Sequence, residues 1–398
     1  MPLTTPPLSL YVHFPWCVRK CPYCDFNSYA LKDALPEERY VQALTVDLRS
    51  QQPEAAGRPL TSIFLGGGTP SLFSPAAIGR VLQGARECFG FAHDVEITLE
   101  ANPGTIERGR FAEYRAAGVN RVSLGAQSFD AQTLKVLGRI HSPAETHRAA
   151  EELHAAGLRN FNLDLMYGLP GQSTASACAD LEQALGLAPT HLSHYQLTLE
   201  PGTLFAAAPP ELPSDEEAAA MLAACEELLG AAGFAQYEIS AYALEGRRAR
   251  HNCNYWSFGD YVGAGAGAHG KLSFAADGCI VRTTHTREPR RYLADPVRSL
   301  SRQVVAPRDL PFEFMLNALR LVEGFDAPVF EKRTGLPWES VAPTMEQLRG
   351  LGLVGARGER WQPTRLGSRF LNEMLLRFLP EPVPARPAAL SRPLQALS

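Results

Sequence analysis

The sequence predicts an α/β protein: a partial (β/α)6 barrel of the TIM type with a smaller, winged-helix-like α+β domain near the C-terminus. The first observation is that six short apolar, β-branched segments alternate with segments of helical period, which is typical of parallel strands joined by crossover helices. The second is that each of the six segments runs into a chemically distinctive loop. A closed barrel needs eight such units, so six predict an open one.

The elements follow in order along the chain. Strands are expected at 9–14, 61–65, 95–100, 121–126, 160–165 and 191–200. The clearest helices are expected at 36–50, 74–89 and 215–233. Proline in the first turn or serine at the N-cap position marks where these helices begin, with Ser74 and Ser214 as the capping residues.

The loops after the six strands predict one shared site. They are the cysteine loop (17–24), "GGGTP" (66–70), "EANPG" (100–104), "AQSF" (126–129), "DLMYGLPGQ" (164–172) and "EPGT" (200–203). In parallel β/α barrels the active site is built from the loops at the C-terminal ends of the strands. Glycine and proline in any single loop can serve only to turn the chain. Six such ends together favour a functional site at the barrel mouth.

We expect four regions. They are the barrel (1–245), an aromatic and glycine-rich connecting region (246–303), a C-terminal domain (304–378) and a disordered, proline-rich tail (379–398). In the C-terminal domain, helices are expected at 310–325, 338–354 and 364–379, and a hairpin at 356–364. Winged-helix folds often bind DNA. This segment is not strongly basic, so a lid or a partner surface is expected instead.

Composition narrows the class of protein. The chain has 398 residues, 45% of them hydrophobic, and a formal net charge of −4 without a long basic run. Nucleic acid and anionic membranes are therefore not expected as partners. We expect no signal peptide and no integral membrane segment, because no window reaches about 18 consecutive apolar residues. A cytoplasmic protein is predicted, in which the five scattered cysteines are buried, inert thiols.

The chemical anomaly is a cluster of three cysteines: Cys17, Cys21 and Cys24 lie within eight residues. A structural zinc ion takes four ligands, usually as two separated pairs, and no second C-x-x-C is present. An iron–sulfur cluster accepts such a tight run, because each thiolate binds one iron. Three thiolates would leave the fourth iron of a [4Fe–4S] cluster open to a ligand. The spacing favours the cluster, with zinc and an accidental grouping as alternatives.

The C-x-x-x-C-x-x-C loop after the first strand, together with "GGGTP" after the second, resembles the radical S-adenosylmethionine (SAM) superfamily. That resemblance implies a partial six-unit barrel and a [4Fe–4S] cluster whose open iron is chelated by the amino and carboxylate groups of SAM. It also implies an external electron donor, whose electron cleaves SAM to methionine and a 5′-deoxyadenosyl radical. The cofactor would supply the chemistry, and the protein would position it.

A longer series of motifs resembles a narrower group within that superfamily. "LYVHFPWCVRKCPYCDF", "IFLGGGTPSL", "LEANPGT", "GVNRVSLGAQSF", "LGRIHS", "LDLMYGLPGQ", "HLSHYQLTLEPGT" and "HNCNYW" follow one another and resemble the HemN/HemW group over roughly residues 8–375. The resemblance implies a set of SAM contacts: Tyr11, Gly67, Gly68, Thr69, Glu100, Gln127, Arg139 and Asp164. Glycine suits close backbone approach to a ligand. Asp164 stands in an apolar strand, where an unpaired carboxylate would be costly.

Two features separate the branches of that group. The oxygen-independent coproporphyrinogen III oxidases carry a further cysteine where this chain has Phe26, and a longer N-terminal extension than the roughly ten residues before Tyr11. The resemblance is closest to the HemW-type haem-chaperone branch, because "HNCNYW" fits its H-N-x-x-Y-W pattern. That implies a haem-binding set: His251, Asn252, Tyr255 and Trp256.

Imidazole is a good axial ligand for haem iron, and aromatic rings can cover a porphyrin face. The alternative is a strand-to-loop junction with a packed aromatic pair and a satisfied histidine. His269 and Cys253 are weaker candidates for an iron ligand.

The function that the resemblance implies is that of a haem chaperone. It would bind haem and a SAM-ligated [4Fe–4S] cluster and deliver haem to acceptor haemoproteins, with respiratory cytochromes as one class. A monomer is expected, with dimerisation on cofactor loading left open, and no catalytic residue is assigned. The alternative is an oxygen-independent coproporphyrinogen III oxidase, and a more distant one is a radical SAM methyltransferase or porphyrin-ring-opening enzyme, since the fold is shared among many activities.

Overall fold

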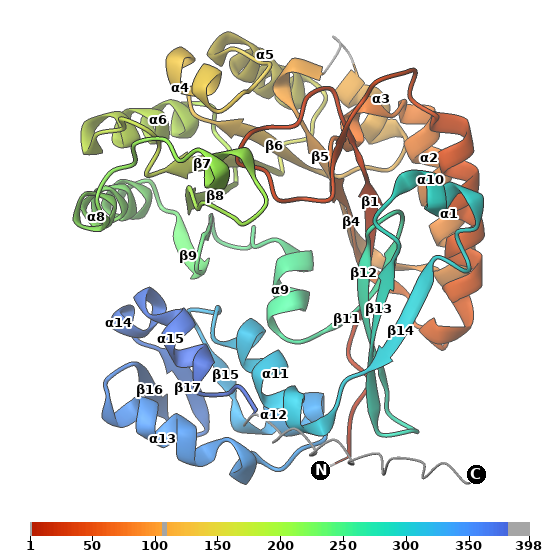
Figure 1. Cartoon of the computed structure of the whole chain (residues 1–398), viewed down its shortest axis with the longest axis vertical. Helices are drawn as coiled ribbons and strands as arrows, with labels where there is room; N and C mark the ends of the chain where they lie inside the picture. Colours follow the sequence, from red (N-terminus) through yellow and green to blue (C-terminus); the bar gives the residue numbers. More distant parts are fainter. Residues whose placement is uncertain (1, 106–109, 381–398) are drawn as a thin grey trace, which may run out of the picture.

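The fold is built on one large mixed sheet. The computed structural model describes residues 2–105 and 110–380, and the sheet there has twelve strands in the order β14-β13-β12-β11-β1-β4-β5-β6-β7-β8-β10-β9 (Figure 1). The six predicted strands are present, adjacent and parallel: β1 (Leu8–Phe14), β4 (Leu60–Gly67), β5 (Phe91–Ala101), β6 (Arg121–Gln127), β7 (Phe161–Tyr167) and β8 (His191–Gln196). The predicted α/β fold class is confirmed.

Helices cover the outer face of these strands, around the right, the top and the left of Figure 1. They are α1 (Glu37–Gln51), α2 (Pro75–Phe89), α3 (Arg110–Ala116), α4 (Ala131–Val136), α5 (Pro143–Ala155), α6 (Thr174–Gly186), α7 (Leu204–Ala207) and α8 (Asp215–Ala231). The predicted caps are present: the Ser74 hydroxyl accepts from the Ala77 N–H at 3.2 Å, and Ser214 forms a capping box with Glu217. Their apolar faces and the strands form the main core.

The region from 246 to 303 extends the same sheet. It contains α9 (Arg250–Trp256), β11 (Asp260–Ala264), β12 (His269–Phe274), β13 (Cys279–His285), α10 (Pro289–Ala294) and β14 (Leu300–Val304). Strand β11 pairs in parallel with β1, and β12 to β14 continue antiparallel. At the other edge, β9 (Ala235–Glu238) and β10 (Ala241–Ala243) pair antiparallel beyond β8. The predicted sixth strand ends at Gln196 and not at residue 200.

The C-terminal domain has its own core and a small sheet. Its elements are α11 (Leu310–Ala318), β15 (Phe325–Asp326), α12 (Ala327–Thr334), α13 (Ala342–Gly350), β16 (Val354–Arg357), β17 (Arg360–Pro363), α14 (Arg365–Arg369) and α15 (Leu371–Leu376). The expected hairpin is present as β16 and β17. The expected helices are shorter: the first ends at Ala318, and the last breaks at Phe370, whose backbone leaves the helical region. The predicted tail lies, from residue 381, outside the described residues.

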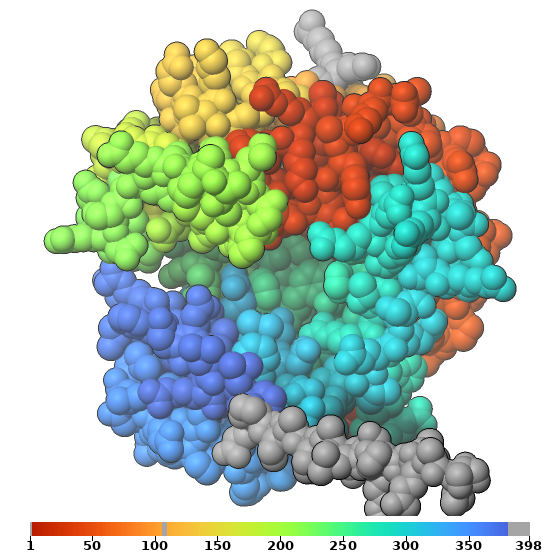
Figure 2. All heavy atoms as spheres, viewed as in Figure 1, coloured from red at the N-terminus to blue at the C-terminus, as the bar shows by residue number. Residues whose placement is uncertain are grey.

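The C-terminal domain packs against the end of α9 and the residues that follow it. Phe258, which follows α9, packs edge-on against Phe314 of α11 at 5.6 Å, within the second core. In Figure 2 this face of the molecule is hollowed between the blue C-terminal domain and the red and green barrel segments. Figure 1, in the same view, shows α9 at that place. Among the described residues, no helix has the length and apolar character needed to cross a membrane.

Candidate functional site

A cavity of about 310 Å³ lies where the parallel strands end. The three cysteines line it, and so do seven of the eight residues expected to contact SAM: Gly67, Gly68, Thr69, Glu100, Gln127, Arg139 and Asp164. The structure therefore gathers residues from five of the six predicted loops at one place. The "EPGT" loop does not line this cavity. Thr203 instead caps α7, and the Phe205 N–H of α7 donates to the carbonyl of Pro22 at 3.0 Å, so this loop supports the cysteine loop.

The cysteine loop is held from several sides. A short parallel pair, β2 (Trp16–Cys17) and β3 (Tyr29–Ala30), joins its two ends. Arg139 donates from Nη1 to the Cys21 sulfur at 3.8 Å. Burial raises the pKa of the Cys17 and Cys24 thiols, and hydrogen bonds with Thr69 and Ser28 offset part of that effect. Donors aimed at sulfur stabilise thiolates, so the loop suits thiolate ligands.

The three cysteines can be compared with what a single zinc ion and a cluster each require. Within residues 2–105 and 110–380, no three cysteine, histidine or carboxylate side chains converge on a point that could hold one metal ion. Zinc needs such convergence, with its sulfur ligands about 2.3 Å from the ion. A [4Fe–4S] cluster instead places each thiolate on a different iron. Three free thiols that line one cavity fit the cluster.

Two carboxylates lie deep in this cavity. Glu100, at the end of β5, accepts from the Gly67 N–H at 2.9 Å, while burial and the nearby charge of Asp164 raise its pKa to about 8. Asp164 on β7 accepts from the Ser123 hydroxyl at 3.1 Å and the Asn162 amide at 2.8 Å, and burial raises its pKa. Neither carboxylate has an ion pair among the described residues, so both can take a cationic or hydrogen-bonding ligand.

Unsatisfied polar atoms around the cavity fit a polar ligand. Arg139 donates from Nη2 to the Gly125 carbonyl at 2.7 Å, but its Nε is buried and without a partner in the described part of the chain. Gln127 has a left-handed backbone (φ 69°), and its Oε1 accepts from the Tyr195 hydroxyl at 2.8 Å. Such strain in a non-glycine residue is more common at functional sites than elsewhere.

The glycines have a reason beyond ligand approach. Gly67 has φ 109°, a conformation that side chains rarely adopt. A Cβ on Gly68 would lie 2.5 Å from the carbonyl oxygen of Trp16. The glycine-rich strand end is therefore required by its packing against the residues that follow β1, and this packing also places Thr69 beside Cys17.

A second cavity, of about 750 Å³, lies beside the first. The four H-N-x-x-Y-W residues, His251, Asn252, Tyr255 and Trp256, all line it. They form two i, i+4 pairs and so share one side of α9. Tyr11 lies here and not in the first cavity: its hydroxyl is 2.7 Å from His13 Nδ1, and its ring stacks on Phe64 at 6.1 Å. The two cavities share three lining residues, Phe26, Gly67 and Glu100.

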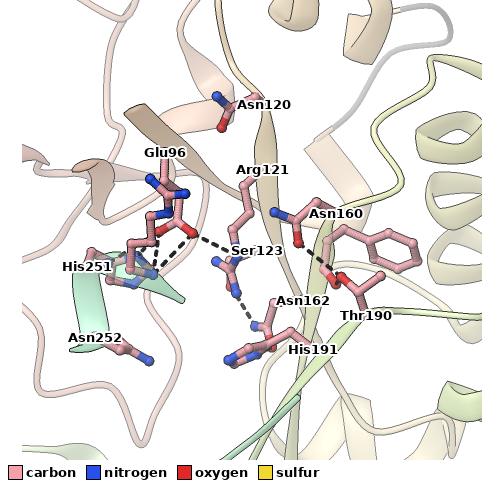
Figure 3. A network of polar contacts seen from close by, with 12 residues as sticks. Glu96, Asn120, Arg121, Ser123, Asn160, Asn162, Thr190, His191, His251 and Asn252 are labelled. Atoms are coloured by element: carbon pink, nitrogen blue, oxygen red, sulfur yellow. Dashed lines mark hydrogen bonds and ion pairs between the residues drawn. The ribbon is translucent and has the colours of Figure 1, made fainter. Parts of the chain in front are cut away.

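His251 is held firmly by a residue that the sequence analysis did not single out. Its Nδ1 lies 3.1 Å from Oε1 of Glu96 (Figure 3). Its ring lies 4.2 Å from that of Phe64. Burial lowers the pKa of His251, although Glu96 opposes this effect. Burial alone would raise the pKa of Glu96, but the hydrogen bond from His251 and the charge of Arg121 lower it to about 2. The pair is thus a neutral imidazole beside a carboxylate.

The other motif residues are also fixed by neighbours. Asn252 donates from Nδ2 to the Tyr237 hydroxyl at 3.1 Å. Tyr255 packs edge-on against Tyr261 at 4.6 Å. The guanidinium of Arg320 in the C-terminal domain lies 4.3 Å from the Trp256 ring centre. The motif therefore lies on a short helix and not at a strand-to-loop junction, and its histidine and aromatic residues have the packed, hydrogen-bonded partners that the alternative also expected.

Further residues of the first cavity were missed from sequence: Ser123, Ser193 and Tyr195 also line it. Their signal was weak, because single polar residues within β6 and β8 are common. They become recognisable only through their contacts: Ser193 donates to Asn162 at 3.1 Å, and Tyr195 donates to Gln127. Glu96 had a clearer signal, since it lies four residues before Glu100 in the same strand and therefore on the same face.

A three-cysteine loop and a glycine-rich strand end at the mouth of a partial β/α barrel define a radical SAM protein. Consistent with this class, residues 11–183 match the family model described as "Radical SAM superfamily", and residues 305–370 match "HemN C-terminal domain". Membership of the superfamily implies a [4Fe–4S] cluster and SAM. The three thiols and the unpaired carboxylates of the first cavity fit both groups.

Similar proteins of known name identify the family within this superfamily. The chain is 51% identical to "Heme chaperone HemW" of Escherichia coli (strain K12), over 94% of this chain and 99% of that protein. It is 46% identical to the protein of that name from Haemophilus influenzae, with the same coverage, and 34% identical to the mouse mitochondrial "Radical S-adenosyl methionine domain-containing protein 1", over 94% of this chain and 87% of that protein. The chain belongs to the HemW family of radical SAM proteins.

A solved structure supports the fold. Coproporphyrinogen III oxidase (HemN) from Escherichia coli superposes with a TM-score of 0.79, covering 94% of this chain and 90% of that chain at 24% identity. At that identity the similarity concerns the architecture, including the C-terminal domain, and not the activity.

Proposed function

We propose that the protein is a haem chaperone, which holds a SAM-ligated [4Fe–4S] cluster in the first cavity, binds haem in the second and delivers it to acceptor haemoproteins. The observation that carries this proposal is the second cavity: an aromatic chamber lined by an oriented histidine that shares a wall with the three-cysteine cavity. The 51% identity to a protein named as a haem chaperone agrees with it.

The second cavity has the properties that haem requires. Its volume of about 750 Å³ is within the range of sites for large cofactors. Tyr11, Tyr255 and Trp256 offer aromatic surface for a porphyrin face. With Nδ1 of His251 engaged by Glu96, Nε2 is the nitrogen left to bind iron, and within the described residues no hydrogen bond reaches it.

The rim of this cavity suits the haem propionates. Arg282 is paired with Glu313, and Lys271 is buried against Asp260. Arg287 also lines the cavity, is exposed, and has no carboxylate partner in the described part of the chain. Its Nε donates to Asn27 Oδ1 at 3.4 Å, and its other nitrogens are well suited to a carboxylate. Arg287 is therefore the proposed propionate anchor.

In the first cavity, the three thiols would hold the cluster, and Glu100, Asp164, Gln127 and Arg139 would hold SAM. When bound, the cluster and SAM supply one-electron chemistry, for which an external donor provides the electron. The residues of the chain would bind and orient SAM. The Gly67 N–H fixes Glu100, and the buried Arg139 Nε offers SAM an unused donor. Acceptors, with respiratory cytochromes as one class, would receive haem through the hollow in Figure 2, from a cytoplasmic monomer.

The test is a haem titration of protein whose cluster has been reconstituted anaerobically. Haem binding is monitored through the Soret band. We expect stoichiometric binding that is lost in His251→Ala and retained in His269→Ala. His269 is the matched control because it lines the same cavity and its Nδ1 contacts Thr284 at 3.2 Å. No binding by the wild type, or equal binding by the His251 variant, contradicts the proposal.

The alternative is the oxidase, which has the same architecture. At the position of the further cysteine that the oxidase branch carries, this chain has Phe26, whose side chain is 58% exposed. The reconstituted sample should be incubated anaerobically with coproporphyrinogen III, SAM and a reductant. Protoporphyrinogen IX as the product would establish the oxidase. Mass spectrometry after incubation with haem instead would detect a methylated or ring-opened porphyrin, the products expected of more distant radical SAM classes.

A further inference from the structure

The contact between strand β5 and helix α9 goes beyond what helix packing requires. Glu96 projects from β5 and is 7% exposed, and its carboxylate meets the first turn of α9, which lies more than 150 residues later in the chain. Its oxygens accept from the Arg250 N–H at 2.9 Å, from the His251 N–H at 3.3 Å and from the His251 ring at 3.1 Å (Figure 3).

Those first two contacts replace a missing cap. The N-cap residue of α9 is Ala249, which has no side-chain acceptor, so the first N–H groups of the helix lack a local partner. Glu96 satisfies two of them from a neighbouring strand. The start of α9, and with it the position of His251, is therefore fixed to the barrel and not only to the helix itself.

The third contact fixes the imidazole. A carboxylate only accepts hydrogen bonds, so the proton of the neutral His251 ring must lie on Nδ1 and the lone pair on Nε2. The charge of Glu96 is balanced by Arg121 of β6, whose Nε lies 4.0 Å away and which is 2% exposed. Phe64 covers the ring from one side at 4.2 Å. Carboxylates that accept from a metal-binding histidine fix its orientation and raise its basicity.

We propose that Glu96 is a positioning residue for haem: it holds His251 as the Nδ1–H tautomer, presents Nε2 to the haem iron and strengthens that nitrogen as a donor. The inference rests on the proposed function, since it assigns a second residue to the same haem site. It also predicts a property of the bound haem. A more basic imidazole stabilises ferric over ferrous iron, so removing the carboxylate raises the reduction potential.

The test compares two substitutions on the same strand. Glu96→Gln keeps an oxygen that can accept from the helix N–H groups but removes the charge that polarises the ring. We expect it to fold, to bind haem roughly 10- to 100-fold more weakly, and to show a higher midpoint potential and a weakened iron–histidine stretching vibration. Asp94→Asn is the matched control, because Asp94 pairs with Arg250 of the same helix at 2.7 Å but is exposed and does not contact His251. Haem affinity, midpoint potential and the iron–histidine vibration should all be unchanged in that variant.

The outcomes separate the inference from the proposed function. If the wild type does not bind haem, or if His251→Ala does not alter the haem spectrum, the proposed function fails and this inference fails with it. If haem binding depends on His251 but Glu96→Gln retains the wild-type potential and vibration, only the inference is overturned. Nitrogen-15 NMR of the wild-type histidines, which needs no variant, should find the Nδ1–H tautomer at His251, and the Nε2–H tautomer would refute the proposal.

Discussion

Glu96 and Glu100 lie four residues apart on β5, so their side chains leave the strand on the same side, yet only Glu100 lines the cavities, at the wall that the two share. Glu96 contacts His251 at the second cavity, while Glu100 accepts from the Gly67 N–H at the first. Their environments also differ: the pKa is lowered to about 2 at Glu96 and raised to about 8 at Glu100. One strand thus connects the proposed haem site with the proposed SAM site through a charged and a protonated carboxyl group.

The raised pKa of Glu100 predicts how stability depends on pH. Burial, followed by the charge of Asp164, raises its pKa to about 8, so the folded protein keeps a proton that the unfolded chain loses near its ordinary value. The stabilisation is complete below that ordinary value. As the pH rises from there through the folded-state pKa, the stabilisation is lost, because the unfolded chain has already released the proton that the folded protein still holds.

We expect the free energy of unfolding, measured with denaturant before reconstitution, to fall as the pH rises from about 4.5 to about 8. Glu100→Gln should weaken this dependence, because glutamine cannot ionise. Glu182→Gln, on the exposed side of α6, is the control and should leave the slope unchanged. An unchanged slope in Glu100→Gln would show that other groups cause the pH dependence.

Each of the three loop cysteines should be necessary for the cluster. Replacing Cys17, Cys21 or Cys24 with serine leaves two thiolates, too few to hold the cube of a site-differentiated cluster. After anaerobic reconstitution, iron and acid-labile sulfide should fall to a small fraction of the wild-type content, and SAM affinity should fall with them. Cys253→Ser is the matched control, since Cys253 lies outside both cavities. Full iron content in any of the three variants would refute the ligand assignment.

The glycine-rich strand end gives a prediction about stability. In Gly68→Ala the new Cβ would lie 2.5 Å from the Trp16 carbonyl oxygen and 2.8 Å from that of Phe14, so backbone must move. We expect a loss of roughly 1–3 kcal/mol in the free energy of unfolding, measured by denaturant titration. Gly79→Ala on α2 is the control: its Cβ would lie 3.5 Å from Ala117, which is ordinary contact, and alanine favours a helix. Equal stability of the two variants would contradict the packing argument.

What the sequence could predict depended on local signals. The six parallel strands are marked by apolar, β-branched residues. Of the fifteen residues expected to bind the cluster, SAM or haem, ten lie at one cavity, where these strands end. Strand β11 had no such signal, because "DYVGA" is short and rich in glycine and alanine. The placement of Tyr11 in the second cavity could not be predicted either, since its side chain direction depends on Phe64 and His13 from the folded sheet.

The contact between Glu96 and His251 was also beyond the sequence. Helix α9 has seven residues and an alanine at its N-cap position, so no local pattern marks its start. The residue that caps it lies on a strand more than 150 positions away and is identified only when β5 and α9 are side by side. Pairings of this kind depend on tertiary structure, whereas capping by Ser74 or Ser214 can be recognised within four residues.

Phe26 gives the last prediction, because it lines both cavities and is 58% exposed. A large exposed aromatic side chain contributes little to folding but can cover the apolar face of a ligand. In Phe26→Ala we expect unfolding free energy within about 0.5 kcal/mol of the wild type, together with haem affinity lowered roughly tenfold, which corresponds to about 1.4 kcal/mol of lost contact.

The measurements are thermal unfolding and haem titration on the same reconstituted sample. Val18→Ala is the matched control, because Val18 is an exposed apolar residue of the same loop, 47% accessible, that lines neither cavity. Weaker haem binding in Phe26→Ala but not in Val18→Ala would place the porphyrin against the wall that the two cavities share. Equal haem affinity in both variants would mean that haem lies away from this wall, deeper toward α9, and that Phe26 acts only on the cluster side.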